Sequence, residues 1–297
     1  MTPRRALNIL VLLWAAMPFS VGEILTRASA EQSHGFKLVV ALLAWSLWAG
    51  GLLSACVPHP ISLTVQRLAT PMSLATVALC SAASTSGSIS PWWFGLAAAH
   101  ATALVSVGLG AYMADACVGA TAYGDEVRFT MRVPFSFAVG PMPVTWLVSA
   151  TSTIAALVLV RHQRIALACI CAVFSIAAWT VTARSYHAMS RRWVVFVPAG
   201  LTFVDHLVAA EPFLVRRQDL SIAPASATPE ALDLALSPLG TPLDVACATP
   251  IEFTRRLSRD SAEVDQTQSI RFSVVRPQAL LSIALQRGFD VEPAALN

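Results

Sequence analysis

Long apolar segments dominate the first 183 residues of the chain, and the pattern changes abruptly at residue 184. A helix that crosses a membrane needs about 20 predominantly apolar residues. The segments that approach this requirement are Ala6–Leu25, Leu38–Cys56, Leu68–Ala83, Trp93–Ala114, Val144–Val160 and Ile165–Ala183. The pattern therefore predicts an α-helical membrane bundle of about six transmembrane helices over residues 1–183.

From Trp193 onward, apolar residues tend to alternate with polar ones, and prolines and glycines separate the alternating runs. A period of two is typical of short strands with one buried face. The predicted strands are Trp193–Pro198, Leu201–His206, Pro212–Arg217, Leu220–Ala223, Leu232–Leu236, Leu243–Cys247, Ile251–Thr254 and Ile270–Val275. Short strands in such close succession predict a soluble antiparallel barrel or sandwich over residues 193–297.

Two segments of this β domain differ from strands. The run Ser258–Gln268 is polar, with Val264 as its only large apolar residue, and it predicts a loop. Near the end of the chain, Pro277 and Gly288 frame a run with a helical period. Proline at a helix start and glycine at its stop are typical, so one helix is expected after the strands.

Residues 184–192 join the two predicted domains and are basic. Arginine and lysine accumulate on the cytoplasmic side of membrane proteins, and aromatic rings prefer the headgroup region. Each basic residue near an anionic leaflet contributes about 1 kcal/mol of attraction. Two roles remain open for this junction, namely anchoring of the topology or binding of anionic lipid headgroups, and both involve the same residues: Arg184, His187, Arg191, Arg192 and Trp193.

Six spans would place both termini on one side of a cell membrane. A cytoplasmic location puts eight arginines inside: Arg4, Arg5, Arg67, Arg128, Arg132, Arg184, Arg191 and Arg192. Four basic residues then lie outside: Arg27, Lys37, Arg161 and Arg164. This bias favours cytoplasmic termini, although the short basic loop 161–164 opposes it. At the N-terminus, the apolar stretch continues past Pro18 to Leu25, which favours an uncleaved first helix over a signal peptide.

The longest loop of the membrane half, Asp115–Pro143, is predicted on the cytoplasmic side. Its segment Val127–Ala138 alternates loosely at the start, which predicts a strand or an interfacial segment. Because both would lie on the same side of the membrane, this loop is expected to be able to contact the C-terminal domain.

Glu23 and His100 are the ionisable residues deepest in the apolar segments. Such residues are expensive to bury in a membrane and are often functional. Glu23, however, stands four residues before Arg27, a spacing that favours an ion pair on one helix face. For His100, a neutral imidazole bonded across helices is favoured over a proton relay. A role for either residue in solute transport is the alternative.

The sequence offers no candidate catalytic residues, cofactor site or metal site. Its six cysteines contain no C-x-x-C pair, and the phosphate-binding, dinucleotide-binding, zinc-protease and nucleophile-elbow motifs are absent. The net charge of +3 is too mild to indicate nucleic-acid binding. Charged residues make up 12% of the chain, against about 25% in ordinary soluble domains, as expected for burial in a bilayer.

The run Tyr186–Asp205 resembles the junction in uncharacterised actinobacterial integral membrane proteins that join several transmembrane helices to a bacterial PH-like domain. Phe196–Val204, followed by Phe213–Arg217 and Leu220–Ile222, is similar to the opening strands of such domains. Arg276–Leu280 also matches a pattern of that group. The resemblance implies a mostly-β PH-like barrel closed by one helix, and it carries over no catalytic residues.

The sequence thus predicts a non-enzymatic membrane protein that acts at the cytoplasmic face as a scaffold or as a lipid-binding or partner-binding module. The alternative is a small-solute transporter or its accessory subunit, with a regulatory C-terminal domain. A membrane enzyme that acts on lipid has the least support, because no convergent acid–base set is visible.

Overall fold

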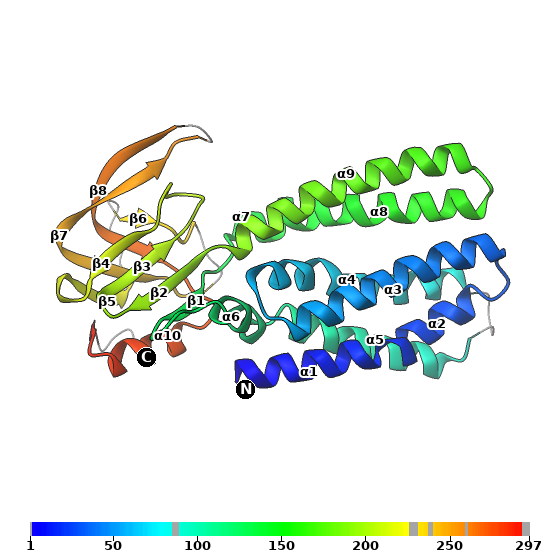
Figure 1. The fold of residues 1–297 in the computed structure, drawn as a ribbon, viewed down its shortest axis with the longest axis horizontal. Coiled ribbons are helices and arrows are strands. Elements are labelled where there is room, and N and C mark those ends of the chain that lie inside the picture. Colours follow the sequence, from blue (N-terminus) through cyan, green and yellow to red (C-terminus); the bar gives the residue numbers. More distant parts are fainter. Residues whose placement is uncertain (1, 85–88, 226–230, 237–239, 259–260, 293–297) are drawn as a thin grey trace. The chain divides into compact units, whose positions relative to one another are not determined.

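The computed structural model describes residues 2–84, 89–225, 231–236, 240–258 and 261–292. The chain divides into two compact units (Figure 1). The helical unit comprises Met1–Cys117 and Met142–His187, and the sheet unit comprises Val118–Pro141 and Ala188–Asn297. Each unit is therefore assembled from two separate stretches of the chain.

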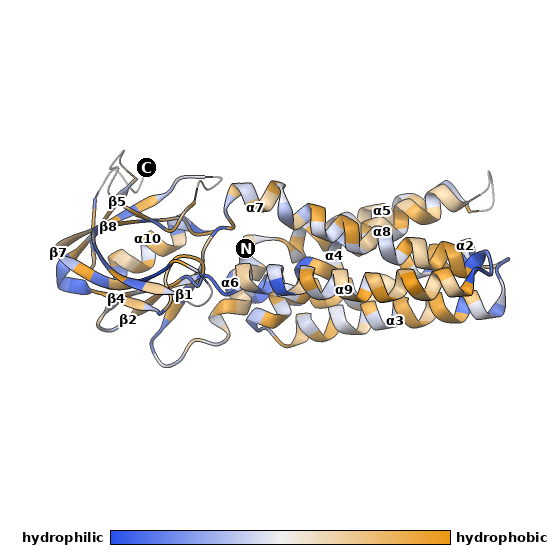
Figure 2. Cartoon of the chain, turned by 90° about the horizontal axis from the view of Figure 1, so that it is seen from above, coloured by the Kyte–Doolittle hydropathy of each residue, from blue (hydrophilic) through white to orange (hydrophobic). Residues whose placement is uncertain are grey.

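Each of the predicted apolar segments contains a helix. In chain order these are α1 (Pro3–Ala16), the 3-10 turn η1 (Met17–Phe19), α2 (Val21–Ala28), α3 (His34–Cys56), α4 (Pro60–Ala83), α5 (Pro91–Gly108), α6 (Ala111–Gly119), α8 (Pro141–Arg161) and α9 (Ile165–Ser190). Apolar residues cover much of these helices, as their orange colour in Figure 2 shows. The first predicted segment is broken at η1, and the fourth is broken between α5 and α6.

Four stretches of helix are long and apolar enough to cross a membrane: Pro3–Ala28, His34–Cys56, Phe135–Arg161 and Ile165–Ser190. α5 and α6, which are bent by 49° relative to each other, would together make a fifth. Among the described residues, the number of membrane-capable helices is therefore four or five, and the predicted count of six is too high.

α4 accounts for much of this difference. It has 24 residues, but polar side chains interrupt its apolar pattern. These polar side chains are buried within the helical unit: Ser62, Thr64, Gln66, Thr70 and Ser73. A helix whose polar face packs against other helices does not need the apolar composition of a lipid-facing helix.

Gln66 of α4 is fully buried and connects three helices. Its side-chain oxygen accepts a hydrogen bond from Nε1 of Trp14 at 2.9 Å, and its nitrogen donates to the carbonyl of Gly51 at 2.7 Å and to Ser54 Oγ at 2.8 Å. Trp14 packs so closely on α3 that a Cβ at Gly51 would lie 2.4 Å from the indole ring. The α1–α3–α4 contact thus depends on one amide and one glycine.

The sheet unit begins with a strand from between the helices. β1 (Val127–Thr130) pairs with β2 (Trp193–Val197), which continues to β3 (Gly200–Val204) and β4 (Phe213–Arg216) in a four-stranded antiparallel sheet. The expected strand in the Asp115–Pro143 loop is therefore present, and it is an integral part of this sheet. The short helix α7 (Phe135–Val139) follows it.

A second sheet has five strands in the order β6-β8-β7-β5-β9. Their bounds are Leu220–Pro224 (β5), Leu232–Asp233 (β6), Leu243–Arg256 (β7), Ala262–Phe272 (β8) and Asp290–Val291 (β9). The predicted helix is confirmed as α10 (Pro277–Gln286), and Gly288 follows it with a φ of +66°. The described strands form two sheets, and no closed barrel is seen among them.

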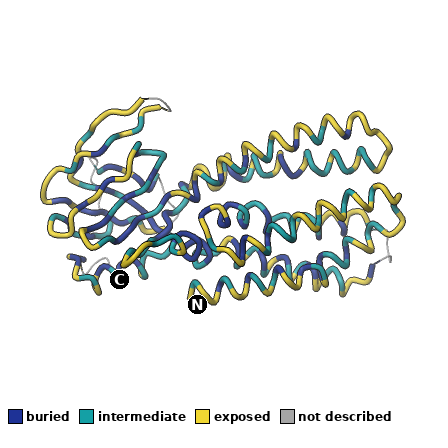
Figure 3. Tube along the Cα trace, viewed as in Figure 1, coloured by how far each residue is buried: buried dark blue, intermediate teal, exposed yellow. Residues whose placement is uncertain are grey.

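One hydrophobic core lies between the elements of the sheet unit, whose buried residues appear dark blue in Figure 3. The inserted segment, Val118–Pro141, contributes Phe129 and Met131 to this core. α10 contributes Leu280, Leu281 and Ala284. The segment around β1 therefore contributes core side chains as well as backbone pairing.

The prediction of a loop over Ser258–Gln268 is wrong for its second part, since β8 already begins at Ala262. β7 and β8 pair from Ile251 with Thr267 out to Arg256 with Ala262. Most side chains of this outer hairpin face solvent, so its strands need no apolar alternation. Residues 259–260 lie outside the described part.

Candidate functional site

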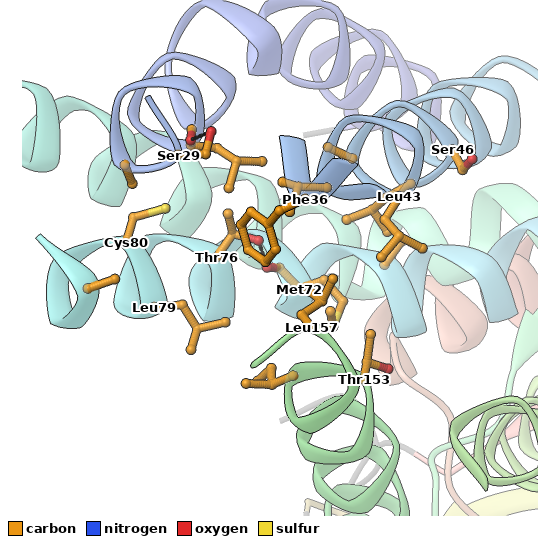
Figure 4. A pocket seen from close by; sticks show the side chains of 18 of the residues that line it. Ser29, Phe36, Leu43, Ser46, Met72, Thr76, Leu79, Cys80, Thr153 and Leu157 are labelled. Atoms are coloured by element: carbon orange, nitrogen blue, oxygen red, sulfur yellow. Dashed lines mark hydrogen bonds between the residues drawn. The ribbon is translucent and has the colours of Figure 1, made fainter. Parts of the chain in front are cut away.

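An apolar cavity of about 610 Å³ lies within the helical unit, between α2, α3, α4, α8 and α9 (Figure 4). This volume falls in the range of about 300–1,000 Å³ that is common for ligand sites. Figure 4 shows the ring of Phe36 projecting toward Met72 and Thr76 of α4. Further apolar side chains complete its walls, including Leu43, Leu79 and Leu157.

Three of the four described hydroxyl residues in these walls are engaged within the protein. The fourth, Ser46, is an exposed residue of α3. Each of the other three donates to a carbonyl oxygen one turn earlier in its own helix: Ser29 to Leu25 at 2.8 Å, Thr76 to Met72 at 2.8 Å, and Thr153 to Ser149 at 2.9 Å. A serine or threonine bonded in this way presents little unsatisfied polarity to its surroundings. The cavity is therefore suited to hydrocarbon more than to a polar solute.

Arg161, the exposed last residue of α8, is the charged residue among the described side chains that line this cavity. Gln32, in the turn between α2 and α3, lines the cavity as well. No pair of ionisable groups converges on the cavity space, so the lining offers no acid–base machinery.

Glu23 forms an ion pair with Arg27, with 2.7 Å between the carboxylate oxygen and Nε. Both side chains are partly exposed, and the Arg27 guanidinium lies 5.0 Å from the centre of the Trp93 ring. Glu23 does not line the cavity. Glu23 lies in the first turn of α2 and Arg27 in its last turn, so this ion pair is the one that the four-residue spacing predicts.

His100 connects α5 to the break between α1 and α2. Its Nε2 lies 2.9 Å from the carbonyl oxygen of Leu13, and its Nδ1 lies 2.6 Å from Ser20 Oγ. A carbonyl only accepts, so Nε2 carries a proton. Ser20 Oγ also donates to the carbonyl of Met17 at 3.3 Å, and the direction of its bond with Nδ1 depends on the tautomer of the ring. Both ring nitrogens of His100 are therefore used within the protein, in hydrogen bonds that join two helical segments.

A side chain of α3 also forms a hydrogen bond at the break between α1 and α2. Pro18 has no N–H, so the carbonyl of Trp14 lacks the usual donor four residues later. The N–H of Met17 donates to this carbonyl, and Nε1 of Trp48 donates to it as well, at 2.7 Å. Side chains of α3 and α5 thus form hydrogen bonds with backbone carbonyls at the break.

The prediction for Arg192 at the junction requires a correction. It is fully buried in the sheet unit, where its guanidinium forms a bidentate pair with Asp205 at 2.9 and 2.7 Å. It also donates to the carbonyl oxygens of Arg132 at 3.2 Å and Leu234 at 2.6 Å. An enclosed guanidinium cannot contact lipid headgroups, so headgroup binding by Arg192, one of its two predicted roles, is excluded. Asp205, the partner that neutralises it, was not recognised from the sequence pattern.

The other junction residues have different surroundings. Arg184 and Arg191 are exposed. His187 lies in the helical unit with its Nδ1 3.2 Å from Thr64 Oγ1, and Trp193 begins β2 with its ring 5.9 Å from the Arg128 guanidinium. The five residues therefore do not form one basic cluster, and two of the three arginines remain available to a membrane surface.

No protein-family model matches the chain, and neither a curated protein nor a solved structure is significantly similar to it. The geometry of the helical unit is thus the basis for a functional interpretation. In the described part of the chain, no three His, Cys, Asp or Glu side chains are grouped so that they could hold a metal ion. The six cysteines are free thiols.

Sequence reasoning did not find the residues that line the cavity. Apolar side chains that face a cavity have the same composition and spacing as those that face lipid, so no sequence signal separates them. Gln66 was also missed, because it lies just before the predicted segment Leu68–Ala83 and next to Arg67.

Proposed function

We propose that this protein is a multi-pass membrane protein that binds a lipid or another hydrophobic molecule between its helices and performs no reaction on it. The observation that carries the proposal is the apolar cavity, in which three of the four described wall hydroxyls are bonded to their own helices. A polar solute would lose hydrogen bonds to water there without replacement, which costs about 1–3 kcal/mol for each group. A hydrocarbon chain has no such penalty.

The surroundings of the cavity support this function. Exposed apolar side chains cover the outer surfaces of α3, α8 and α9, among them Leu42, Trp45, Val148, Val173 and Phe174. Large exposed apolar surfaces on a folded protein are typical of contact with a bilayer or a partner. A molecule that is dissolved in the bilayer would therefore be adjacent to the cavity.

We further propose that the protein lies in the cell membrane with both termini and the sheet unit in the cytoplasm. The sheet unit would act there as a PH-like scaffold or partner-binding module. Four spans, an even number, would keep both termini on one side, and the exposed Arg184 and Arg191 favour the cytoplasmic side. The antiparallel pairs among β1–β4 and among β5, β7 and β8, followed in the chain by α10, support the PH-like assignment. Fold alone does not specify the partner.

Filling the cavity tests the binding function. Gly50 lines the cavity, and a Cβ at this position would meet nothing within 4 Å. Gly95 of α5 has equally open space but does not line the cavity, so it provides a matched control. Both Gly50→Leu and Gly95→Leu add the same side chain and the same helix propensity.

The measurement is native mass spectrometry of the full chain purified in mild detergent. The wild type and Gly95→Leu are expected to retain bound lipid, and Gly50→Leu is expected to retain several-fold less. Equal retention by all three proteins, or the absence of bound lipid from the wild type, would contradict the proposal.

A further inference from the structure

A second cavity of about 470 Å³ lies beside the first, between α2 and α3. The two cavities share six lining residues: Leu25, Ser29, Val40, Ala44, Leu47 and Thr76. They therefore adjoin each other along one face of α2 and α3. Each also has walls of its own, with Gly50 and Gly51 in the first cavity and Ala41 and Trp48 in the second.

Both cavities start at the same end of the helical unit. Ser29, at the end of α2, lines both, and Gln32 and Ala30 of the following turn line one each. From this end the cavities extend along α3. At about 1.5 Å per residue, Phe36–Gly51 in the first cavity covers about 22 Å, and Lys37–Trp48 in the second covers about 16 Å.

The length of the second cavity is close to the depth of one membrane leaflet, and the first cavity is longer. The hydrocarbon core of a bilayer is about 30 Å thick, so each leaflet contributes acyl chains over about 15 Å. Two adjoining apolar cavities that begin at one end, each at least as long as a leaflet is deep, have the form expected of a site for a molecule with two hydrocarbon chains.

A positive charge stands at the starting end of each cavity. Arg161 lines the first cavity from the last turn of α8, and Lys37 lines the second from the first turn of α3. Both side chains are exposed. Arg27, which is nearby in the sequence, is neutralised by Glu23. Glu31, in the turn between α2 and α3, lines neither cavity.

We propose that the two cavities form one site for an anionic phospholipid with two acyl chains, one chain in each cavity and the phosphate group near Lys37 and Arg161. This inference rests on the proposed function and specifies its ligand. Basic side chains attract anionic headgroups, and arginine in particular suits the geometry of phosphate oxygens.

The test uses delipidated full-length protein in detergent and native mass spectrometry with three probes. These are dioleoyl phosphatidylglycerol, dioleoyl phosphatidylcholine, and single-chain oleoyl phosphatidylglycerol. The first is expected to bind at least tenfold more tightly than either of the others. The second probe tests the headgroup charge, and the third tests the requirement for two chains.

Variants assign the contacts. Lys37→Gln and Arg161→Gln are each expected to weaken binding of dioleoyl phosphatidylglycerol about fivefold, since each basic residue contributes about 1 kcal/mol. Arg164→Gln is the control, because Arg164 is exposed and basic but lines neither cavity. Ala41→Leu narrows only the second cavity and Gly50→Leu only the first, and each is expected to weaken the two-chain probe more than the single-chain probe.

The outcomes separate this inference from the proposed function. Equal affinity for all three probes, or no effect of Lys37→Gln and Arg161→Gln, would overturn the two-chain anionic site while lipid binding itself stands. If none of the probes binds to the wild type, both the inference and the proposed function fail.

Discussion

Arg192 and Asp205 form a two-point ion pair that is enclosed in the sheet unit, with nitrogen–oxygen distances of 2.9 and 2.7 Å. Arg192 stands at the start of β2 and Asp205 directly follows β3. The same guanidinium reaches the carbonyl oxygens of Arg132 and Leu234. One side chain therefore connects the inserted segment, the first hairpin and the chain that follows β6.

Removal of one partner should destabilise the sheet unit strongly. Arg192→Met leaves the Asp205 carboxylate buried and unpaired, and such a change typically lowers the free energy of unfolding by about 3–5 kcal/mol. The double variant Arg192→Met with Asp205→Leu should recover part of this loss. Denaturant unfolding measures the effect, and Arg191→Gln at the exposed neighbour should change stability by less than about 0.5 kcal/mol.

The inserted strand should be required for the sheet unit to fold. Residues 193–297 alone lack β1, so β2 loses its pairing partner and the core loses Phe129 and Met131. We expect this fragment to be unstable when expressed by itself. Joining residues 118–141 to residues 188–297 through a flexible linker should restore cooperative thermal unfolding. A cooperative transition of equal midpoint without residues 118–141 would contradict the expectation.

His206 should make the sheet unit less stable in mild acid. Burial lowers its pKa below the ordinary value of 6.5, and the charges of Arg191 and Arg256 lower it further, against an opposing effect of Asp205. The unfolded chain therefore binds more protons than the folded one as the pH falls through about 6.5. Stability decreases in this window and levels off once the pH is below the pKa of the folded state.

Unfolding midpoints between pH 8 and pH 5 measure this effect. His206→Gln should flatten the dependence in this window, whereas His162→Gln, at an exposed position in the turn between α8 and α9, should leave it unchanged. An equally steep loss of stability in the wild type and in His206→Gln would show that other groups cause it.

Gly51→Ala should destabilise the helical unit. The added Cβ would lie 2.4 Å from the ring of Trp14, which is fully buried and cannot move aside. Overpacking of this kind costs about 1–3 kcal/mol. Gly50→Ala is the matched control, since a Cβ there meets nothing within 4 Å. The melting temperature in detergent should fall only for Gly51→Ala.

His100→Ala should lower thermal stability without changing proton-coupled uptake. The substitution removes two hydrogen bonds and leaves the Leu13 carbonyl without its side-chain donor, a loss of about 1–3 kcal/mol. Melting in detergent and pH-driven solute uptake into vesicles are the two measurements. Altered uptake at unchanged stability would favour the transporter alternative.

The helices were predictable because their apolar residues are continuous. α9, for example, contains the predicted segment Ile165–Ala183 in full. α4 begins eight residues before the predicted Leu68, because its first turns carry buried polar residues such as Thr64 and Gln66 that satisfy their hydrogen bonds within the unit. Apolar composition therefore identifies helices with apolar surfaces, but it underestimates the length of a helix whose polar side chains pack against other helices.

The sheet unit shows the opposite limitation. The alternation of apolar and polar residues predicts the ends of β2 and β4 and the start of β3 to within one residue. The end of β3 differs by two residues, since the predicted strand extends to His206 and β3 ends at Val204. It missed the outer part of β8, whose side chains mostly face solvent. The burial of Arg192 could not be predicted, because its charge is balanced by a residue whose position depends on the fold.

The pairing of β1 with β2 constrains how the intervening chain crosses a membrane. Hydrogen bonds between Val127–Thr130 and Trp193–Phe196 require both strands to be in the same aqueous compartment. The chain between them must then cross the bilayer an even number of times. α8 and α9 therefore either both cross or both remain on one side, and a single crossing is incompatible with the sheet.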